Sequence, residues 1–354
     1  MSTWVRIVFG FAGLFIELVV LDAAIRTFLL PRVADVTFSR ITAQLIRRFF
    51  NLIAGHKSYL TKDRILSLYA SITLLAYQAL WLGLSLVAFA FFFVAAGAPS
   101  YSLAFEVSGS SLFSAGIHRG TLSAVGYIEA GVGLTLLALL IAFIGPLYQS
   151  FQRREYAVSH LAVRAGAPAT PWGVLEIAQS VESYDRLDEL WREWEQWFID
   201  VGETHTTLPI LNFYRSPLPT QTWIGCAATV LDAAALFNAA VDAKPSPTAG
   251  LCIRAGWLTL RRIADYFRVP YPTVLTKDIP ISVSREDFEI VLTRLESVGV
   301  PILADHDAAW TDFVGWRVNY DAMIEHFYAL FTCPRTDWRT AAVQPFFGPS
   351  NKRA

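Results

Sequence analysis

Three carboxylates, Glu17, Glu106 and Glu129, stand inside long apolar segments in the N-terminal part of this 354-residue chain. An ionisable side chain in such a segment is costly, so it usually faces a cavity or a polar partner. Glu106 and Glu129 flank a segment of small and polar residues. We expect both to brace the backbone of that segment from behind. For Glu129 two alternatives stay open: it lines a water-filled path, or it pairs with His118 or Arg119.

Glu17 lacks an evident basic partner in its own segment. Asp22, by contrast, lies four residues before Arg26, which is the spacing of an ion pair within one helix. We expect Glu17 either to be protonated or to form a hydrogen bond to a neighbouring helix, with Tyr77 or Gln78 as the partner. A role in proton relay is the alternative.

The C-terminal half holds one group of polar residues that can act together: Glu203, His205, Arg215 and Asp232. A metal site needs three or four ligands at defined spacing, and this group does not supply them, so we expect no metal. The chain has no P-loop, no G-x-G-x-x-G after a strand, no H-E-x-x-H and no G-x-S-x-G. These absences predict a protein that is not an enzyme and needs no cofactor. The net charge of −1 gives no indication of nucleic acid binding.

Two long stretches without charge, residues 65–105 and 130–152, indicate a membrane protein. About 20 mostly apolar residues are enough to cross a bilayer. We predict three spans, over about residues 5–25, 65–95 and 121–148. Between the last two lie a short apolar segment and a turn that contains glycine.

The order of elements between residues 96 and 148 is that of the pore module of a cation channel. A helix too short to cross a bilayer comes first, then a backbone loop, then a spanning helix. Irregular backbone at membrane depth is tolerated only where it is buried in protein or lines a water-filled cavity. This order therefore predicts a permeation path.

The fold class that follows is mainly α, with three spans and one re-entrant pore loop joined to a mostly helical soluble domain. Residues 1–63 form the first span and a basic amphipathic connector, and residues 64–152 form the pore module of outer helix, half-helix, loop and inner helix. Residues 153–171 are a linker, and residues 172–354 are the soluble domain. In that domain Trp191, Trp194 and Trp197 recur every three residues, which predicts a buried helical stripe. Residues 313–318 are expected to form a strand.

Basic residues predict the orientation in the membrane. Eight Lys or Arg residues lie between positions 26 and 64, and Arg153 and Arg154 follow the third span, whereas the loop before that span has only Arg119. The positive-inside rule then places the connector and the soluble domain in the cytoplasm and the N-terminus outside. We expect a multi-pass protein of the plasma membrane, which is the inner membrane of a bacterium.

The connector contains apolar residues at helical spacing with arginines between them. This pattern predicts an amphipathic helix, whose apolar positions are Ile41, Leu45, Phe49 and Leu52. Two partners are open: anionic lipid at the membrane surface, or the protein's own cytoplasmic domain.

The segment from Ser108 to Arg119, SGSSLFSAGIHR, resembles the pore loop of bacterial potassium-channel-like proteins, which reads close to S-G-x-T-F-F-T-x-G-Y-G-D. Residues 129–133 and 144–155 resemble the inner helix of that family and its exit. Residues 203–209, 214–217 and 223–236 are similar to its C-terminal region. The resemblance covers most of the chain from residue 100 onward, and it implies a homotetramer in which each chain supplies one quarter of the pore.

The filter departs from the family pattern. Ser114, Ala115 and Gly116 take the first three places of T-x-G-Y-G-D, Ile117 takes the aromatic place, His118 replaces the second glycine and Arg119 replaces the aspartate. Potassium filters turn successive carbonyl oxygens toward the ion, and the glycines permit the required dihedral angles. We therefore expect a channel with weak or altered selectivity for a monovalent ion, a cation being favoured. The alternative is a non-conducting, membrane-anchored sensor or scaffold with a degenerate pore.

Four residues interrupt the predicted inner helix: Gly131, Gly133, Gly145 and Pro146. Proline removes a backbone hydrogen bond and kinks a helix. We expect these residues to form the hinge of a gate near the cytoplasmic exit.

Overall fold

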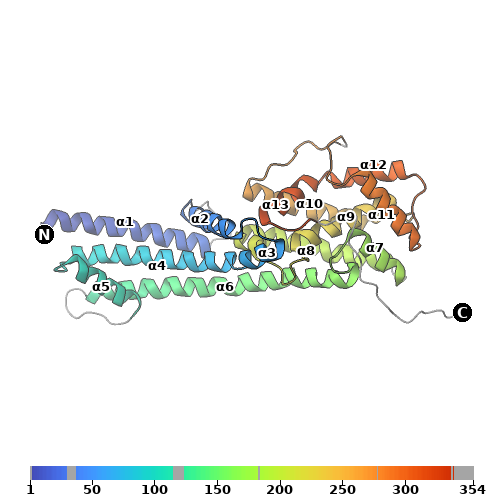
Figure 1. Cartoon of the computed structure of the whole chain (residues 1–354). Helices are drawn as coiled ribbons and strands as arrows, with labels where there is room; N and C mark the ends of the chain where they lie inside the picture. Colours follow the sequence, from blue (N-terminus) through green and yellow to red (C-terminus); the bar gives the residue numbers. More distant parts are fainter. Residues whose placement is uncertain are drawn as a thin grey trace. The chain divides into compact units, whose positions relative to one another are not determined.

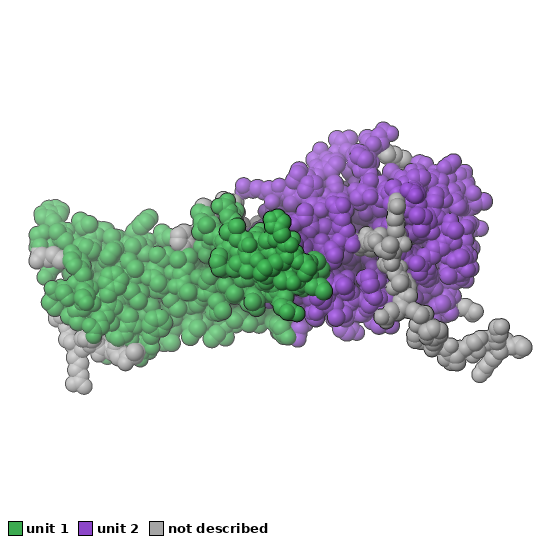
Figure 2. All heavy atoms as spheres, in the orientation of Figure 1, with its two compact units in different colours: residues 1–149 green, residues 150–354 purple. Residues whose placement is uncertain are grey.

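The computed structural model describes residues 2–29, 37–114, 123–181, 184–276, 278–335 and 338. The described residues form α-helices, two short 3-10 helices and an isolated β-bridge between Val241 and Ile302. The mainly α fold class is therefore confirmed. The chain divides into two compact units, Met1–Gln149 and Ser150–Ala354, which Figure 2 shows in green and purple.

Three long helices of the first unit lie side by side (Figure 1). They are α1 (Thr3–Phe28), α4 (Tyr69–Ala95) and α6 (Ser123–Ala165), whose last residues belong to the second unit. The ring of Phe28 in α1 lies 4.9 Å from that of Trp81 in α4 and 4.8 Å from that of Phe143 in α6. One aromatic cluster thus joins all three helices.

Between α4 and α6 lies the short helix α5 (Tyr101–Leu112). At 12 residues it measures about 18 Å, less than the roughly 30 Å of a bilayer core. Ser100 caps its N-terminus by accepting a hydrogen bond from the Leu103 amide at 3.1 Å. Ala104 and Val107 on its buried face pack against a cluster of α4 residues that includes Phe93.

Two further helices, α2 (Thr37–Ala54) and α3 (Tyr59–Leu66), occupy the connection between α1 and α4. The helix predicted for this connection is therefore present.

Four segments of the described chain are long and apolar enough to cross a membrane: Thr3–Phe28, Tyr59–Ala95, Ala124–Ala165 and Trp223–Ala240. The first three coincide with the predicted spans and fit a multi-pass membrane protein. The fourth is α9, and 89% of it is buried inside the protein. Its apolar composition is explained by its place at the centre of the second unit, where α7, α10, α12 and α13 pack around it.

The second unit is a helical domain around one large core. Its helices are α7 (Pro171–Ser180), α8 (Leu187–Thr207), α9 (Trp223–Ala240), α10 (Pro247–Phe267), α11 (Arg285–Ser297), α12 (His306–Arg317) and α13 (Asp321–Phe331), with 3-10 turns η1 (Tyr184–Arg186) and η2 (Pro209–Phe213). Side-chain caps start several of them, as where Thr222 accepts from the Gly225 amide at 3.1 Å. The predicted tryptophan stripe of α8 is buried, with Trp191 fully enclosed.

A close helix contact in this core depends on a glycine. A Cβ atom at Gly256 of α10 would lie 2.6 Å from Leu231 Cδ2 of α9, which is closer than side chains tolerate. The glycine therefore lets these two helices approach one another.

Two expectations about the second unit need revision. The strand predicted over residues 313–318 is wrong, because these residues lie in α12 and at its end; Phe313 packs on Phe288 of α11 with centroids 5.1 Å apart, so the apolar run reflects burial and not a strand. Residues 153–165 of the expected linker continue α6 as helix, and only residues 166–170 connect α6 to α7.

Candidate functional site

A buried polar contact joins α5 to the two long helices beside it. Ser108 Oγ of α5 lies 2.8 Å from the Leu86 carbonyl oxygen of α4 and 2.5 Å from Glu129 Oε1 of α6. Ser108 and Glu129 are both fully buried. Glu129 therefore braces the short helix α5, whereas the loop that it was expected to brace lies outside the described residues.

The number of hydrogens in this contact limits its chemistry. A serine hydroxyl has one hydrogen to donate, and neither a carbonyl nor an ionised carboxylate has any. The contacts of Ser108 with Leu86 and with Glu129 are both hydrogen bonds at the same time only when Glu129 carries the second hydrogen. The geometry therefore fits a neutral carboxylic acid at Glu129.

The second buried carboxyl group contacts the same turn of α4 from α1. Ser85 Oγ donates to Glu17 Oε1 at 3.3 Å, and Glu17 is buried. The expected partners, Tyr77 and Gln78, are thus replaced by Ser85: Tyr77 stacks on Trp81, and the Gln78 amide has no hydrogen-bond partner among the described residues. Sequence reasoning missed Ser85, whose only signal was its place about two turns further along the same helix face.

Glu17 contacts α4 at Ser85, and Ser108, the partner of Glu129, contacts α4 at the next residue, Leu86. Each carboxyl group keeps one buried oxygen, Oε2, that has no hydrogen-bond partner among the described residues, and Ser111 Oγ of α5 is in the same state. We call Glu17, Ser85, Ser108 and Glu129 the carboxyl layer. It is a polar layer inside the bundle of α1, α4, α5 and α6 that contains acids and hydroxyls.

Glu106 is not part of the carboxyl layer, and the bracing role expected for it stays a prediction. It lies on the exposed side of α5, whereas Ser108 lies on the buried side. Side chains two residues apart on a helix point to different faces. Glu106 is therefore free to face a surface outside this bundle.

The predicted filter begins where α5 ends. Ser114 follows the helix with a φ of +53°, in the left-handed region that few residues other than glycine adopt. The other five filter positions, Ala115, Gly116, Ile117, His118 and Arg119, lie outside the described residues. The structure thus describes the short helix α5 and Ser114, the first of the six predicted filter positions.

The four residues expected to form a hinge fall into two groups. A Cβ atom at Gly133 would lie 2.5 Å from the Leu112 carbonyl oxygen, so Gly133 lets α6 approach the C-terminal end of α5. Side chains at Gly131 and Gly145 would meet no atom within 4 Å, and α6 continues as helix through Pro146. Gly133 thus serves the packing of α6 against α5.

The polar group predicted in the second unit does not assemble into one site. Glu203 pairs with Arg262 at 2.5 Å, and Arg215 donates to the Phe331 and Thr332 carbonyl oxygens at 2.8 and 3.1 Å. The hydrogen bond that Glu203 accepts from Arg262 lowers the pKa of Glu203. The first contact joins α8 to α10 and is exposed, whereas the second joins the loop after η2 to the end of α13 and is partly buried.

His205 contacts a buried arginine that sequence reasoning did not single out. Arg154 Nη1 lies 3.2 Å from His205 Nε2 and 2.8 Å from the Leu211 carbonyl oxygen. Burial, and then the Arg154 charge, lower the pKa of His205 well below its usual range. A guanidinium can only donate, so Nε2 of the neutral ring accepts the hydrogen bond.

Arg154 is fully buried and satisfies several groups at once. Besides His205 and Leu211, it donates to the Tyr214 carbonyl oxygen at 2.8 Å and to Glu155 Oε1 at 2.7 Å. The Arg153–Arg154 pair gave a sequence signal for the end of a span, yet only Arg153 is exposed, where it pairs with Asp200 at 3.1 Å. The sequence pattern alone did not show that Arg154 is buried whereas Arg153 is exposed.

Asp232 belongs to a separate buried network. It pairs with Arg317, and it accepts from the Tyr320 hydroxyl at 2.8 Å. Arg317 Nε also donates to Asp321 at 2.8 Å. Burial opposes the charge on Arg317, but Asp232 and Asp321 outweigh that effect and raise its pKa. Arg317 thus compensates two buried carboxylates.

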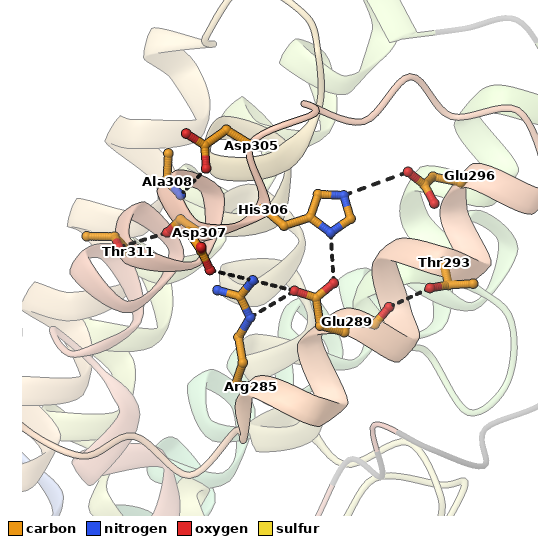
Figure 3. Close-up of polar contacts among 9 residues, drawn as sticks. All are labelled: Arg285, Glu289, Thr293, Glu296, Asp305, His306, Asp307, Ala308 and Thr311. Atoms are coloured by element: carbon orange, nitrogen blue, oxygen red, sulfur yellow. Dashed lines mark hydrogen bonds and ion pairs between the residues drawn. The ribbon is translucent and has the colours of Figure 1, made fainter.

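A histidine at the start of α12 joins α11 to α12 at the surface (Figure 3). His306 Nδ1 lies 2.8 Å from Glu289, and its Nε2 lies 3.8 Å from Glu296. Arg285 bridges Glu289 and Asp307. Burial alone would raise the pKa of Glu289, but the hydrogen bonds from His306 and Arg285 lower it.

Among the described residues no group of three or more His, Cys, Asp or Glu side chains is placed to hold a metal ion. Comparisons with models of protein families, with curated proteins and with solved structures give no match for this chain. The interpretation of its function therefore rests on its own residues and their geometry.

Proposed function

We propose that this chain is one subunit of a tetrameric pore-loop ion channel of the potassium-channel type, with weak or altered selectivity among monovalent cations. The observation that carries the proposal is the arrangement of α5. A helix too short to span a bilayer is packed against α4 and fixed to α6 by the contact between Ser108 and Glu129. The chain then turns at Ser114 into the segment that resembles a filter.

The assembly and orientation belong to the same proposal. One half-helix and one loop supply a quarter of a pore, so four copies surround the path. The basic connector between residues 26 and 64 favours a cytoplasmic second unit and an N-terminus outside, in the plasma membrane.

The decisive experiment is single-channel recording from the full chain in planar bilayers, with the mass of the purified complex measured beside it. We expect a mass of four subunits and unitary currents carried by K⁺ and Na⁺ at similar conductance. A complex of one or two chains would overturn the tetramer, and a sharply potassium-selective current would overturn the proposed selectivity.

The charge at Arg119 gives a first testable prediction about selectivity. A unit positive charge 4 Å from a cation costs about 4 kcal/mol at an effective dielectric constant near 20, and four copies would ring the mouth. Arg119→Asp should therefore increase cation preference over anions. Under a tenfold KCl gradient the reversal potential should move toward the cation limit of about 59 mV, with Arg119→Gln giving an intermediate value. An unchanged reversal potential with intact tetramers would show that this charge does not face the ions.

A second candidate is a membrane-anchored sensor or scaffold that does not conduct. The substitution of His118 and Arg119 for a glycine and an aspartate favours it, because the outer part of a carbonyl ladder needs glycine dihedral angles. Tetramers that stay silent under voltage, membrane tension and changes of pH would support the scaffold over the channel.

A further inference from the structure

The connector helix α2 is covered on one part of its apolar surface only. Phe50 and Ala54 are buried, and the Phe50 ring lies 5.8 Å from that of Tyr69. The Tyr69 hydroxyl also donates to the Ala43 carbonyl oxygen of α2 at 3.2 Å. Since Tyr69 is the first residue of α4, these contacts fix α2 at the N-terminal end of that span.

The remaining apolar surface of α2 is open. Four large side chains at helical spacing form one stripe along it, and Leu52 is 80% exposed. The stripe consists of Ile41 (47%), Leu45 (58%), Phe49 (59%) and Leu52. A stripe of this kind on a helix indicates that an apolar partner covers it.

The charge around the stripe is of one sign. Residues 36–62 contain no Asp or Glu and five Lys or Arg residues. Arg48, which lies between Leu45 and Leu52 along the helix, is exposed, as is Lys57 just beyond its end. A second copy of α2 placed against this face would bring like charges together, whereas anionic lipid headgroups would be attracted to it.

The position of α2 along the spans agrees with a lipid partner. A 27-residue α4 is about 40 Å long, which exceeds the roughly 30 Å bilayer core. Its first turn, where α2 is fixed, therefore lies at the level of the headgroups.

We propose that α2 is an interfacial helix whose open stripe inserts into the boundary between headgroups and acyl chains and whose basic residues bind anionic phospholipid. The inference rests on the chain being a membrane protein and not on whether it conducts. Anionic lipid is then a ligand of a helix that is fixed directly to α4, the helix that packs against α5.

The depth of the stripe can be measured on the full chain in nanodiscs. Single cysteines carry nitroxide labels at Leu52→Cys and Phe49→Cys, with Asn51→Cys as the matched control, because it is exposed on the same helix and points about 100° away from Leu52. Cys333, the partly exposed native thiol, is replaced by serine. We expect labels 49 and 52 to collide more with oxygen than with an aqueous nickel chelate, and label 51 to show the reverse.

Two outcomes of this measurement would overturn the proposal. Labels at 49 and 52 that are as accessible to nickel as label 51 would mean that the stripe faces water. Labels that neither quencher reaches would mean that protein, from the second unit or another copy, covers it.

The charge preference has a separate test. Spin-labelled phosphatidylglycerol and phosphatidylcholine compete for the purified wild-type protein, and we expect phosphatidylglycerol to associate more strongly. Arg48→Gln should lower the relative association constant about fivefold, as expected for one basic residue near the surface. Arg262→Gln, an exposed arginine of the second unit, should leave it unchanged. An equal preference in the wild type and Arg48→Gln would contradict the anionic-lipid site.

Discussion

Buried acids in the two units of the molecule meet different partners. In the first unit Glu17 and Glu129 contact the hydroxyls of Ser85 and Ser108. In the second unit Asp232 contacts the guanidinium of Arg317 and the hydroxyl of Tyr320. Both arrangements remove carboxyl groups from water, but only the second supplies a compensating positive charge.

The difference indicates whether each unit holds its buried carboxyl groups as charged carboxylates or as neutral acids. An ion pair survives burial when both charges and their remaining hydrogen-bonding groups are satisfied. A carboxyl group with only hydroxyl and carbonyl groups nearby is accommodated most simply as a neutral acid, which also fits the two contacts of Ser108. Neutral replacements should therefore be tolerated in the carboxyl layer and harmful in the ion-pair network.

The largest expected effect is the loss of Arg317. Arg317→Met leaves Asp232 and Asp321 buried without their cation, and breaking a buried pair in this way costs about 3–5 kcal/mol. Urea unfolding of the full chain in nanodiscs, followed by tryptophan emission, measures the loss, since nine of the eleven tryptophans lie after residue 150. Arg262→Gln is the matched control: it breaks an exposed pair with Glu203, so a change below about 1 kcal/mol is expected. Equal effects of the two variants on the free energy of unfolding would show that the buried network of Arg317 contributes no more to stability than the exposed pair of Arg262 and Glu203.

The next effect concerns Glu129. Glu129→Gln keeps a group that donates to Ser108, so we expect the stability of the proposed tetramer to stay within about 1 kcal/mol of the wild type. Glu129→Ala removes the brace and leaves a cavity behind α5, which should cost about 1–3 kcal/mol and abolish unitary current. The fraction of tetramer that survives graded heating measures stability, and bilayer recording measures current. A Gln variant as damaged as the Ala variant would show that Glu129 works as a charged group.

Much of the first unit was predictable because a helix that can cross a bilayer needs about 20 mostly apolar residues, and such segments are easily recognised in a sequence. Two uncharged runs and one mostly apolar segment predicted three spans, and each coincides with a helix long and apolar enough to cross a membrane; a buried partner for Glu129 was also expected, and Ser108 is that partner. The partner of Glu17 was not predictable, because Tyr77, Gln78 and Ser85 all offer polar atoms on one helix and only packing selects among them. Gly133 was expected to act as a hinge because nothing in a sequence distinguishes a flexible glycine from one at a close contact.

The second unit was less predictable, since its polar contacts join helices that are far apart in sequence. His205 contacts Arg154, 51 residues away, and Asp232 contacts Tyr320, 88 residues away. Residues near one another in the chain, such as Glu203 and His205, have different partners. The run at 313–318 was assigned to a strand because a short buried helix and a buried strand have similar apolar composition.

The smallest expected effect is a pH dependence that follows from His205. Its pKa in the folded protein is lowered by burial and by Arg154, while in the unfolded chain it returns to about 6.5. Below that value the unfolded chain binds a proton that the folded protein does not, so stability falls as pH falls, by up to about 1.4 kcal/mol per pH unit. His205→Gln has no proton to gain, and its side-chain oxygen can still accept from Arg154, so urea midpoints between pH 7 and 5 should become flat. His160→Gln, at a partly exposed histidine of α6, is the matched control, and this variant should still lose stability as pH falls. A wild type whose midpoint does not move over this range would mean that the Arg154 contact does not hold His205 neutral.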